Sequence, residues 1–321
     1  MERRRRRLPP LNPLRGRFPG RGGSRRPLRM RLTGRPIRPM PILKMISPAD
    51  IITLMNFLCG VLAVMSSVDK GDGFRTAMLL IMLGVVFDGL DGPVARRFGS
   101  SHRFGIWLDS IADAVTFTIA PAILVYNLYR DPAEGFFDSF QPLIVLVSSI
   151  SIALVGILRL AKFSIYAHKW KDFIGLPTPA MAMTVVSLSA VFYLAPEVGL
   201  DVDYLTTGKT VMLPMLFFIL SLAMVADVRY RKYHGKAMVI SGLIVLALII
   251  CLLVSIEEPA VGFAGSLLFS ILALSYVLSP ITSGPGHIWG AADRARENAL
   301  EEELFEDEDI EEGEIEEEYV P

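Results

Sequence analysis

The chain has 321 residues, of which 52% are hydrophobic and 20% are charged, and its mean hydropathy is +0.46. The net charge of −1 conceals an asymmetry, because residues 1–44 hold 15 of the 32 Lys and Arg residues and residues 293–321 hold 15 of the 33 Asp and Glu residues. The long middle is therefore too apolar and too poor in charge for an ordinary soluble domain. Cys59 and Cys251 both lie in apolar runs, which excludes a disulfide scaffold and favours small buried side chains.

Both ends of the chain are predicted to be tails without a packed core. Residues 1–39 are rich in Arg, Pro and Gly and lack apolar periodicity, which is typical of a disordered basic segment. This segment is a solvated tail, an extension ahead of a start at Met40 or Met45, or a stretch that binds anionic lipid headgroups. Residues 286–321 end in an acidic run, which favours a solvated tail over a partner-binding segment. Residues 40–285 form the predicted membrane domain, for which we expect no nucleic-acid partner.

The middle of the chain contains eight apolar segments. Each approaches the roughly 20 residues that cross a bilayer as a helix, and none shows the alternating pattern of a membrane strand. Because only helices and closed barrels satisfy their backbone polar groups in lipid, the sequence predicts an all-α polytopic membrane protein with about eight transmembrane helices. The segments are 50–68, 75–95, 105–128, 141–160, 176–195, 211–227, 237–256 and 261–281.

The loops between these segments differ in their content of basic residues. If the basic N-terminus is cytoplasmic, the inside loops carry eleven Lys and Arg residues and the outside loops carry four. Cytoplasmic loops of membrane proteins are enriched in these residues, whereas acidic residues contribute little to orientation. The distribution therefore predicts that both termini are cytoplasmic.

Four aspartates stand inside the second and third apolar segments, where charge is costly and usually functional. Asp88 and Asp91 are three residues apart and Asp109 and Asp113 are four apart, so each pair lies on one face of its helix. A short loop joins the two helices, which we expect to be antiparallel neighbours. The sequence therefore predicts four carboxylates in one cavity at the cytoplasmic end. The alternative is a charged loop whose aspartates cap two helix ends, but apolar residues flank three of the four.

Clustered carboxylates repel one another unless positive charge lies between them. An all-oxygen ligand set suits Mg²⁺, Mn²⁺ or Ca²⁺ rather than zinc, and four aspartates can hold two such ions about 4 Å apart for phosphoryl chemistry. Arg96 follows Asp88 by eight residues, so it lies near the same helix face and could pair with a phosphate. Gly92 and Ala95, which are small residues of that face, would let a phosphate or sugar approach the backbone.

The same region resembles a family signature. The resemblance is to the CDP-alcohol phosphatidyltransferase family, covers roughly residues 47–280 and includes neither tail. Every fixed position of the family pattern is present at the family spacing, which makes the pattern long and specific. The matching stretch reads Asp88-Gly-Leu-Asp91-Gly92-Pro-Val-Ala95-Arg96, then eight residues, then Gly105-x3-Asp109-x3-Asp113.

Within the family, the chain is most similar to phosphatidylserine synthases and to their archaeal counterparts that make archaetidylserine. The first apolar segment resembles those enzymes at Thr53-Leu-Met-Asn56-x3-Gly60, and further likeness lies in residues 159–164, 173–180 and 224–230. The chain departs from residues common in the subgroup at Trp107, Thr116-Phe117-Thr118, Lys162 and Ser164. These departures concern the choice of alcohol acceptor rather than the class of reaction.

The resemblance implies a reaction and a site. A CDP-linked lipid, CDP-diacylglycerol or CDP-archaeol, would donate its phosphatidyl or archaetidyl group to L-serine, and CMP would leave. The resemblance also implies two Mg²⁺ or Mn²⁺ ions, Asp113 as the general base, a homodimer, and an active site at the cytoplasmic face of the cell membrane. The metal ligands would be Asp88, Asp91, Asp109 and Asp113. The residues that would bind the CDP-lipid are Asn56, Asp88, Asp91, Gly92, Ala95, Arg96 and Gly105.

Two basic residues at the end of the fourth segment are candidates for binding the acceptor. Arg159 and Lys162 are three residues apart at the predicted cytoplasmic end, where they could hold the carboxylate of serine. Otherwise they are anchors that extend to the membrane interface. Two further functions stay open: transfer to glycerol phosphate or inositol phosphate, and ion-coupled transport. A transporter is disfavoured because its charges would lie near the membrane midplane rather than at one face.

Overall fold

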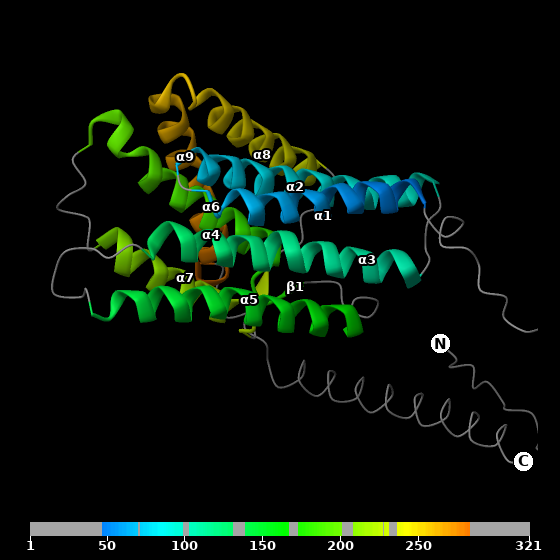
Figure 1. Cartoon of the computed structure of the whole chain (residues 1–321). Helices are drawn as coiled ribbons and strands as arrows, with labels where there is room; N and C mark the ends of the chain where they lie inside the picture. Colours follow the sequence, from blue (N-terminus) through cyan, green and yellow to red (C-terminus); the bar gives the residue numbers. More distant parts are fainter. Residues whose placement is uncertain are drawn as a thin grey trace, which may run out of the picture. The chain divides into compact units, whose positions relative to one another are not determined.

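The computed structural model describes residues 47–69, 71–98, 103–130, 139–166, 173–200, 208–226, 228–230 and 236–282. These residues are mostly helical (Figure 1), which confirms the predicted helical class. The predicted tails, 1–39 and 286–321, lie outside the described residues. The α-helices are α1 (Pro48–Ser66), α2 (Asp72–Phe98), α3 (Arg103–Asp113), α4 (Ala120–Tyr129), α5 (Gln141–Tyr166), α6 (Thr178–Leu194), α7 (Leu213–Ala223), α8 (Lys236–Val254) and α9 (Pro259–Thr282).

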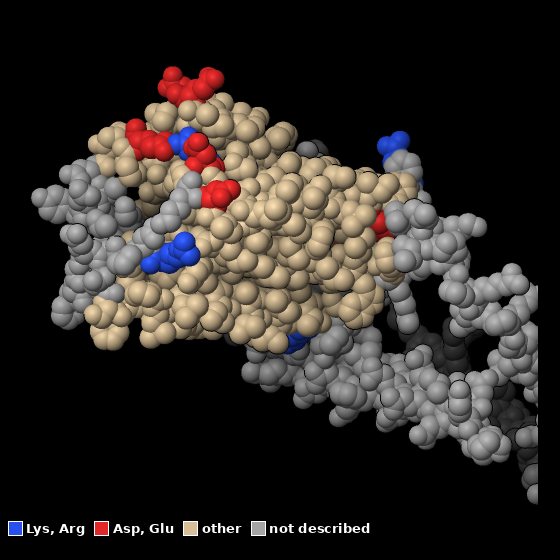
Figure 2. Space-filling model, in the orientation of Figure 1, with Lys and Arg blue, Asp and Glu red and all other residues tan. Residues whose placement is uncertain are grey.

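Six helical stretches among the described residues are long and apolar enough to cross a membrane. The other two predicted segments form shorter apolar helices, Thr210–Ala223 and Ile240–Val254. On the face shown in Figure 2, charged side chains gather toward the two ends and a broad uncharged surface lies between them. Helix length and this distribution of charge indicate an integral membrane protein.

Helix α1 begins at a fixed residue because its sequence provides a complete N-terminal cap. The hydroxyl of Ser47 accepts a hydrogen bond from the backbone N–H of Asp50 (3.3 Å), and the Asp50 carboxylate accepts one from the N–H of Ser47 (2.7 Å). Pro48 fits the first turn, where its missing N–H would have had no helical partner. The cap thereby fixes the register of the polar residues Thr53 and Asn56 further along α1.

The third apolar segment is one continuous helical stretch that contains a π-helical turn. Helix α3 ends at Asp113, the π turn runs over Ala114–Ile119, and α4 continues from Ala120. A π turn inserts one extra residue into a helix, so the side chains beyond it are rotated relative to those of an unbroken helix. The sequence predicts an uninterrupted helix here, because residues 114–119 contain no Gly or Pro that would mark the change.

Contacts at the two ends indicate that successive helices alternate in direction. At one end, the two-residue strands β1 (Phe173–Ile174) and β2 (Arg229–Tyr230) pair antiparallel. At the other end, Arg75 of α2 forms an ion pair with Glu197 and donates to the backbone oxygen of Ser255 (3.0 Å). The small strand pair is a local addition to the predicted all-α architecture. It forms because two loops that meet at the same end satisfy each other's backbone groups.

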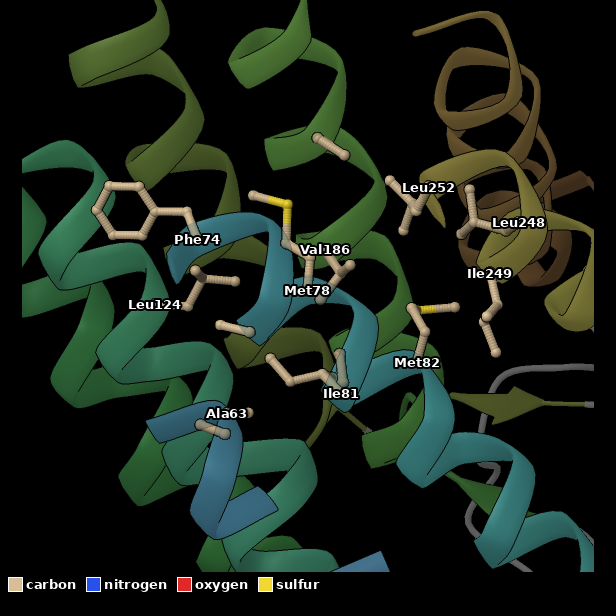
Figure 3. Close-up of a cluster of buried hydrophobic side chains, with 14 of the residues drawn as sticks. Ala63, Phe74, Met78, Ile81, Met82, Leu124, Val186, Leu248, Ile249 and Leu252 are labelled. Atoms are coloured by element: carbon tan, nitrogen blue, oxygen red, sulfur yellow. The ribbon is translucent and has the colours of Figure 1, made fainter. Parts of the chain in front are cut away.

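Helix α6 is the most deeply buried of the six long apolar stretches. One hydrophobic cluster packs α2 against α6 and α8, and it includes Met78, Ile81 and Met82 of α2 with Val186 and Leu248 (Figure 3). Close packing of this kind resists displacement of a helix. The packing of α2 against α6 and α8 therefore fixes the position of the acidic end of α2.

Candidate active site

Three carboxylates from α2 and α3 meet at one site. Asp88, Asp91 and Asp109 are half-buried, and each offers an oxygen within 4.8 Å of the oxygens offered by the others. Both helices pack along α1, which lies between them in Figure 1. The predicted convergence of the two acidic pairs is thus present for three of the four aspartates. Asp113, one turn beyond Asp109, stands close enough to these three for their charges to interact.

Helix α1 contacts one carboxylate from each acidic pair. Thr53 Oγ1 donates to Oδ2 of Asp91 (3.1 Å), and Asn56 Nδ2 donates to Oδ1 of Asp113 (3.1 Å). Thr53 and Asn56 are three residues apart and therefore share a face of the helix. Asn56, predicted to bind the CDP-lipid, is fully buried and contacts the carboxylate predicted to be the general base. One helix face thus orients carboxylates on both neighbouring helices.

The donor set of the three-aspartate cluster fits a hard divalent cation. The cluster offers carboxylate oxygens alone, and oxygen ligands suit Mg²⁺ and Mn²⁺. Within the described part of the chain, Oδ1 of Asp109 is buried and has no hydrogen-bond partner. A buried carboxylate oxygen needs a donor or a cation to compensate for its lost hydration. Asp88, Asp91 and Asp109 are therefore the residues that would hold a metal ion.

Small residues allow close approaches around the cluster. A Cβ atom on Gly105 would lie 2.9 Å from Oδ1 of Asp50, closer than Cβ atoms normally come, so glycine lets α3 approach the first turn of α1. Arg96 is exposed, and its Nη1 lies 3.5 Å from the position that a Cβ on Gly92 would occupy. Ala95 is half-buried. Gly92 follows Asp88 by four residues, and Arg96 lies beside Gly92 one turn further along α2.

The two candidate acceptor residues of α5 have different surroundings. Arg159 is only 8% exposed, and its Nη1 donates to Oγ1 of Thr178 in the first turn of α6 (3.3 Å). Within the described residues its Nε has no partner, and its charge lies near enough to Asp113 for attraction. Lys162 is exposed, although it follows three residues later. The structure therefore brings Arg159 toward the carboxylates and leaves Lys162 at the surface.

Three threonines that contact site residues were not assigned a role from the sequence. Thr53 binds Asp91, Thr178 binds Arg159, and Thr116 Oγ1 donates to the backbone oxygen of Asn56 (2.9 Å). The spacing of Thr53 from Asn56 was a usable signal, because it places both on one helix face. Thr116 likewise follows Asp113 by three residues, but its hydrogen-bond partner Asn56 lies in α1, and Thr178 has no such spacing from a predicted site residue.

The family model described as CDP-alcohol phosphatidyltransferase matches residues 46–225 of this chain. The match covers slightly more than half of the chain and includes all four aspartates. It ends before α8 and α9, which lie beyond the matched residues.

Three curated proteins illustrate the similarity. The chain is 33% identical over 225 residues to the CDP-diacylglycerol–serine O-phosphatidyltransferase of Methanocaldococcus jannaschii, which covers 67% of this chain and 94% of that protein. It is 33% identical over 198 residues to the archaetidylserine synthase of Methanothermobacter thermautotrophicus, covering 60% and 73% of the two chains. It is 37% identical over 140 residues to the CDP-diacylglycerol–serine O-phosphatidyltransferase of Bacillus subtilis, covering 43% and 72%.

Proposed function

This chain belongs to the CDP-alcohol phosphatidyltransferase family, and on that basis we propose that it transfers a phosphatidyl or archaetidyl group from a CDP-linked lipid to L-serine and releases CMP. The meeting of Asp88, Asp91 and Asp109 carries this proposal, because phosphoryl transfer depends on stabilising negative charge and clustered carboxylates can hold cations for that purpose. Serine as the acceptor is supported by the names of the relatives, two CDP-diacylglycerol–serine O-phosphatidyltransferases and one archaetidylserine synthase. The proposed donor is CDP-diacylglycerol or CDP-archaeol.

The proposed site would hold two Mg²⁺ or Mn²⁺ ions. Asp88, Asp91 and Asp109 would supply most of the ligands, and Asp113 is proposed as the fourth. Bound metal would neutralise the diphosphate of the donor and the charge that develops as CMP leaves. The residues proposed to bind the CDP-lipid are Asn56, Asp88, Asp91, Gly92, Ala95, Arg96 and Gly105.

Asp113 is proposed as the general base. Asn56 Nδ2 donates to Oδ1 of Asp113 and orients the carboxylate, which would receive the proton of the serine hydroxyl. The serine oxygen forms a bond to the β-phosphorus of the donor, and the bond from that phosphorus to the bridging oxygen breaks. The bridging oxygen leaves with CMP, so atoms and charge balance once the proton resides on Asp113.

Arg159 is proposed to bind the carboxylate of serine. It is a buried cation near Asp113, and its Nε has no partner within the described residues. Lys162, the second candidate, is exposed. One buried cation suits the single carboxylate of serine better than the phosphate of glycerol phosphate or inositol phosphate, which favours two or more convergent cations. We therefore rank those two acceptors below serine.

We further infer a membrane domain over residues 40–285 with eight spans, both termini in the cytoplasm and the site at the cytoplasmic face. The ratio of eleven to four basic residues and the alternation of helix ends support this arrangement. In a background without native cysteines, Arg97→Cys should react with a membrane-impermeant reagent only after permeabilisation, and Glu257→Cys should react in intact cells. The opposite pattern would invert the topology. The homodimer implied by the resemblance stays a prediction.

Labelled serine tests the proposed reaction. Membranes containing the protein are given CDP-diacylglycerol or CDP-archaeol with labelled serine, and we expect label in the lipid fraction with equimolar CMP. Asp91→Asn should abolish transfer, whereas Asp72→Asn, at the exposed start of the same helix, should not. Label from glycerol phosphate or inositol phosphate but not from serine would show that the acceptor is wrong. No transfer to any of them would refute the reaction.

A further inference from the structure

The π-helical turn Ala114–Ile119 follows Asp113 directly and is enclosed by other helices. Thr116, Phe117 and Thr118 are all 0% exposed. These three successive side chains are covered by neighbouring helices, whereas Ala114, Val115 and Ile119 are half-buried. Single π turns inside long helices occur frequently at functional sites. The position of this turn, one residue after Asp113, makes its contacts relevant to the orientation of that carboxylate.

Hydrogen bonds join this turn to Asp113 through α1. Thr116 Oγ1 donates to the backbone oxygen of Asn56 (2.9 Å), and Asn56 Nδ2 donates to Oδ1 of Asp113 (3.1 Å). Asp113 and Thr116 are also joined by the backbone of their own helix. The three residues therefore form a closed ring in which the helix fixes one side and Asn56 fixes the other. Asn56 and Thr116 are fully buried, so water does not compete for these bonds.

Two glycines let the neighbouring helices close around Thr116. A Cβ on Gly60 of α1 would lie 2.8 Å from Cα and 2.9 Å from N of Thr116. A Cβ on Gly84 of α2 would collide with Cγ2 of Thr116 and would lie 2.9 Å from Oδ1 of Asn56. Both approaches are closer than real Cβ atoms allow, so α1 and α2 hold the threonine on two sides. The hydrogen-bonded ring is thus fixed by close packing as well as by its own bonds.

We propose that Thr116 is a positioning residue of the active site, which acts through Asn56 to fix the direction of the Asp113 carboxylate. The proposal rests on the proposed function in taking Asp113 as the group that receives the proton of the acceptor. The Thr116 hydroxyl is hydrogen-bonded to Asn56 and is linked to the Asp113 carboxylate through it, so Thr116 is not a catalytic residue. Its removal should therefore slow turnover and leave substrate binding largely unchanged.

Paired substitutions at Thr116 separate its hydroxyl from its shape. Thr116→Val keeps the branched shape and loses the donor, and Thr116→Ser keeps the donor. We expect Thr116→Val to lower kcat by about 10- to 100-fold, because a small misplacement of a reacting group has effects of this order. The KM values for CDP-lipid and serine should stay within about twofold, and Thr116→Ser should keep kcat within about threefold of wild type.

Thr184→Val is the matched control. Thr184 is also a fully buried threonine, but its hydroxyl donates to the Ala180 backbone oxygen of its own helix (2.8 Å). It should show kcat and both KM values near wild type. Thermal unfolding in detergent is measured for all variants, so that a loss of folded protein is not counted as a loss of turnover. Equal loss of kcat in Thr116→Val and Thr184→Val would overturn the proposal.

A double substitution tests whether Thr116 acts through Asn56. In the Asn56→Leu background, Thr116→Val should lower kcat by less than about twofold, because the link to Asp113 is already broken. A full additional loss there, or a rise in KM that accounts for the whole effect of Thr116→Val, would refute a positioning role. Wild-type transfer is measured first with serine, glycerol phosphate and inositol phosphate. A silent wild type refutes the proposed function, whereas an active wild type with a normal Thr116→Val refutes only this inference.

Discussion

The two ends of the helices contain acidic residues in opposite surroundings. At one end, Asp88, Asp91 and Asp109 are half-buried and direct their oxygens toward one another. At the other end, Glu257 and Glu258 are exposed in the turn between α8 and α9, where Figure 2 shows acidic side chains at the surface. Exposed carboxylates are hydrated, and water screens the repulsion between them. Partly buried acids that meet need a ligand or another source of positive charge.

Arg75 illustrates how the protein itself neutralises an acid. Its guanidinium pairs with Glu197, donates to the backbone oxygen of Ser255 and lies 5.6 Å from the centre of the Tyr193 ring. These contacts join α2 to the ends of α6 and α8 and identify a structural ion pair. At the other end, Asp91 and Asp113 instead accept hydrogen bonds from the neutral hydroxyl of Thr53 and the neutral amide of Asn56. Arg159 lies near Asp113, but the three-aspartate cluster has no ion pair among the described residues.

Metal removal should reduce activity more than any substitution below, and it should act through the end that contains Asp88, Asp91 and Asp109. Because Asp88, Asp91 and Asp109 are proposed to hold the cations that would neutralise the donor diphosphate, chelation of divalent metals should reduce CMP release to background, and Mg²⁺ or Mn²⁺ should restore it. Transfer is measured before and after dialysis against a chelator. Full activity after exhaustive chelation would show that the three clustered aspartates are not a functional metal site, unlike what we propose for this end of the molecule.

Asp113→Asn should cause the second-largest loss of activity, because asparagine keeps the shape of the side chain and removes the proposed proton acceptor. General-base catalysis contributes typically about 10²- to 10⁴-fold, so we expect kcat to fall by at least about 100-fold. Binding of CDP-lipid should persist, since the three-aspartate cluster is intact. Equilibrium binding of labelled CDP-lipid is compared with that of Asp88→Asn, which should bind poorly. If both variants lose binding equally, Asp113 is chiefly a ligand.

Arg159→Ala should have an intermediate effect and should separate the two substrates. A hydrogen bond to a charged group contributes about 1.5–3 kcal/mol, so the KM for serine should rise by about 10- to 100-fold, with a smaller change for CDP-lipid. Arg159→Lys should recover part of the loss, because an ammonium group cannot reproduce a forked contact. Initial rates at varied serine and varied CDP-lipid provide both values. An unchanged KM for serine would make Arg159 a structural residue like Arg75.

The smallest effect is expected for Glu197→Gln at the opposite end. Its side chain is one-third exposed, and ion pairs of this kind contribute about 1 kcal/mol or less. The variant should unfold at a slightly lower temperature in detergent and should transfer the lipid phosphatidyl or archaetidyl group to serine at the wild-type rate. Unfolding is followed by circular dichroism and transfer by CMP release. A large loss of transfer with little change in unfolding temperature would assign this end a role in catalysis.

The helices and the acidic cluster could be predicted from the sequence because both depend on local spacing. Apolar length identifies a helix without reference to the rest of the chain. A spacing of three or four residues places Asp88 with Asp91 on one face, whatever the neighbouring helix is. The sequence did not identify the π turn, since residues 114–119 contain no Gly or Pro to mark it. It also did not identify the strand pair, because each strand has only two residues and depends on its partner.

The sequence by itself thus determined the helical class, the segregation of basic residues between loops, and the pairing of aspartates within each helix. Tertiary structure alone decided that α1 packs against both acidic helices and that Asn56 meets Asp113, which is 57 residues away. It also decided that Arg159 is buried while Lys162 is exposed. Two positions three residues apart differ by about 60° around a helix, so they can fall on opposite sides of a packing boundary. The location of that boundary depends on how the helices rotate against one another, and contacts between distant segments fix that rotation.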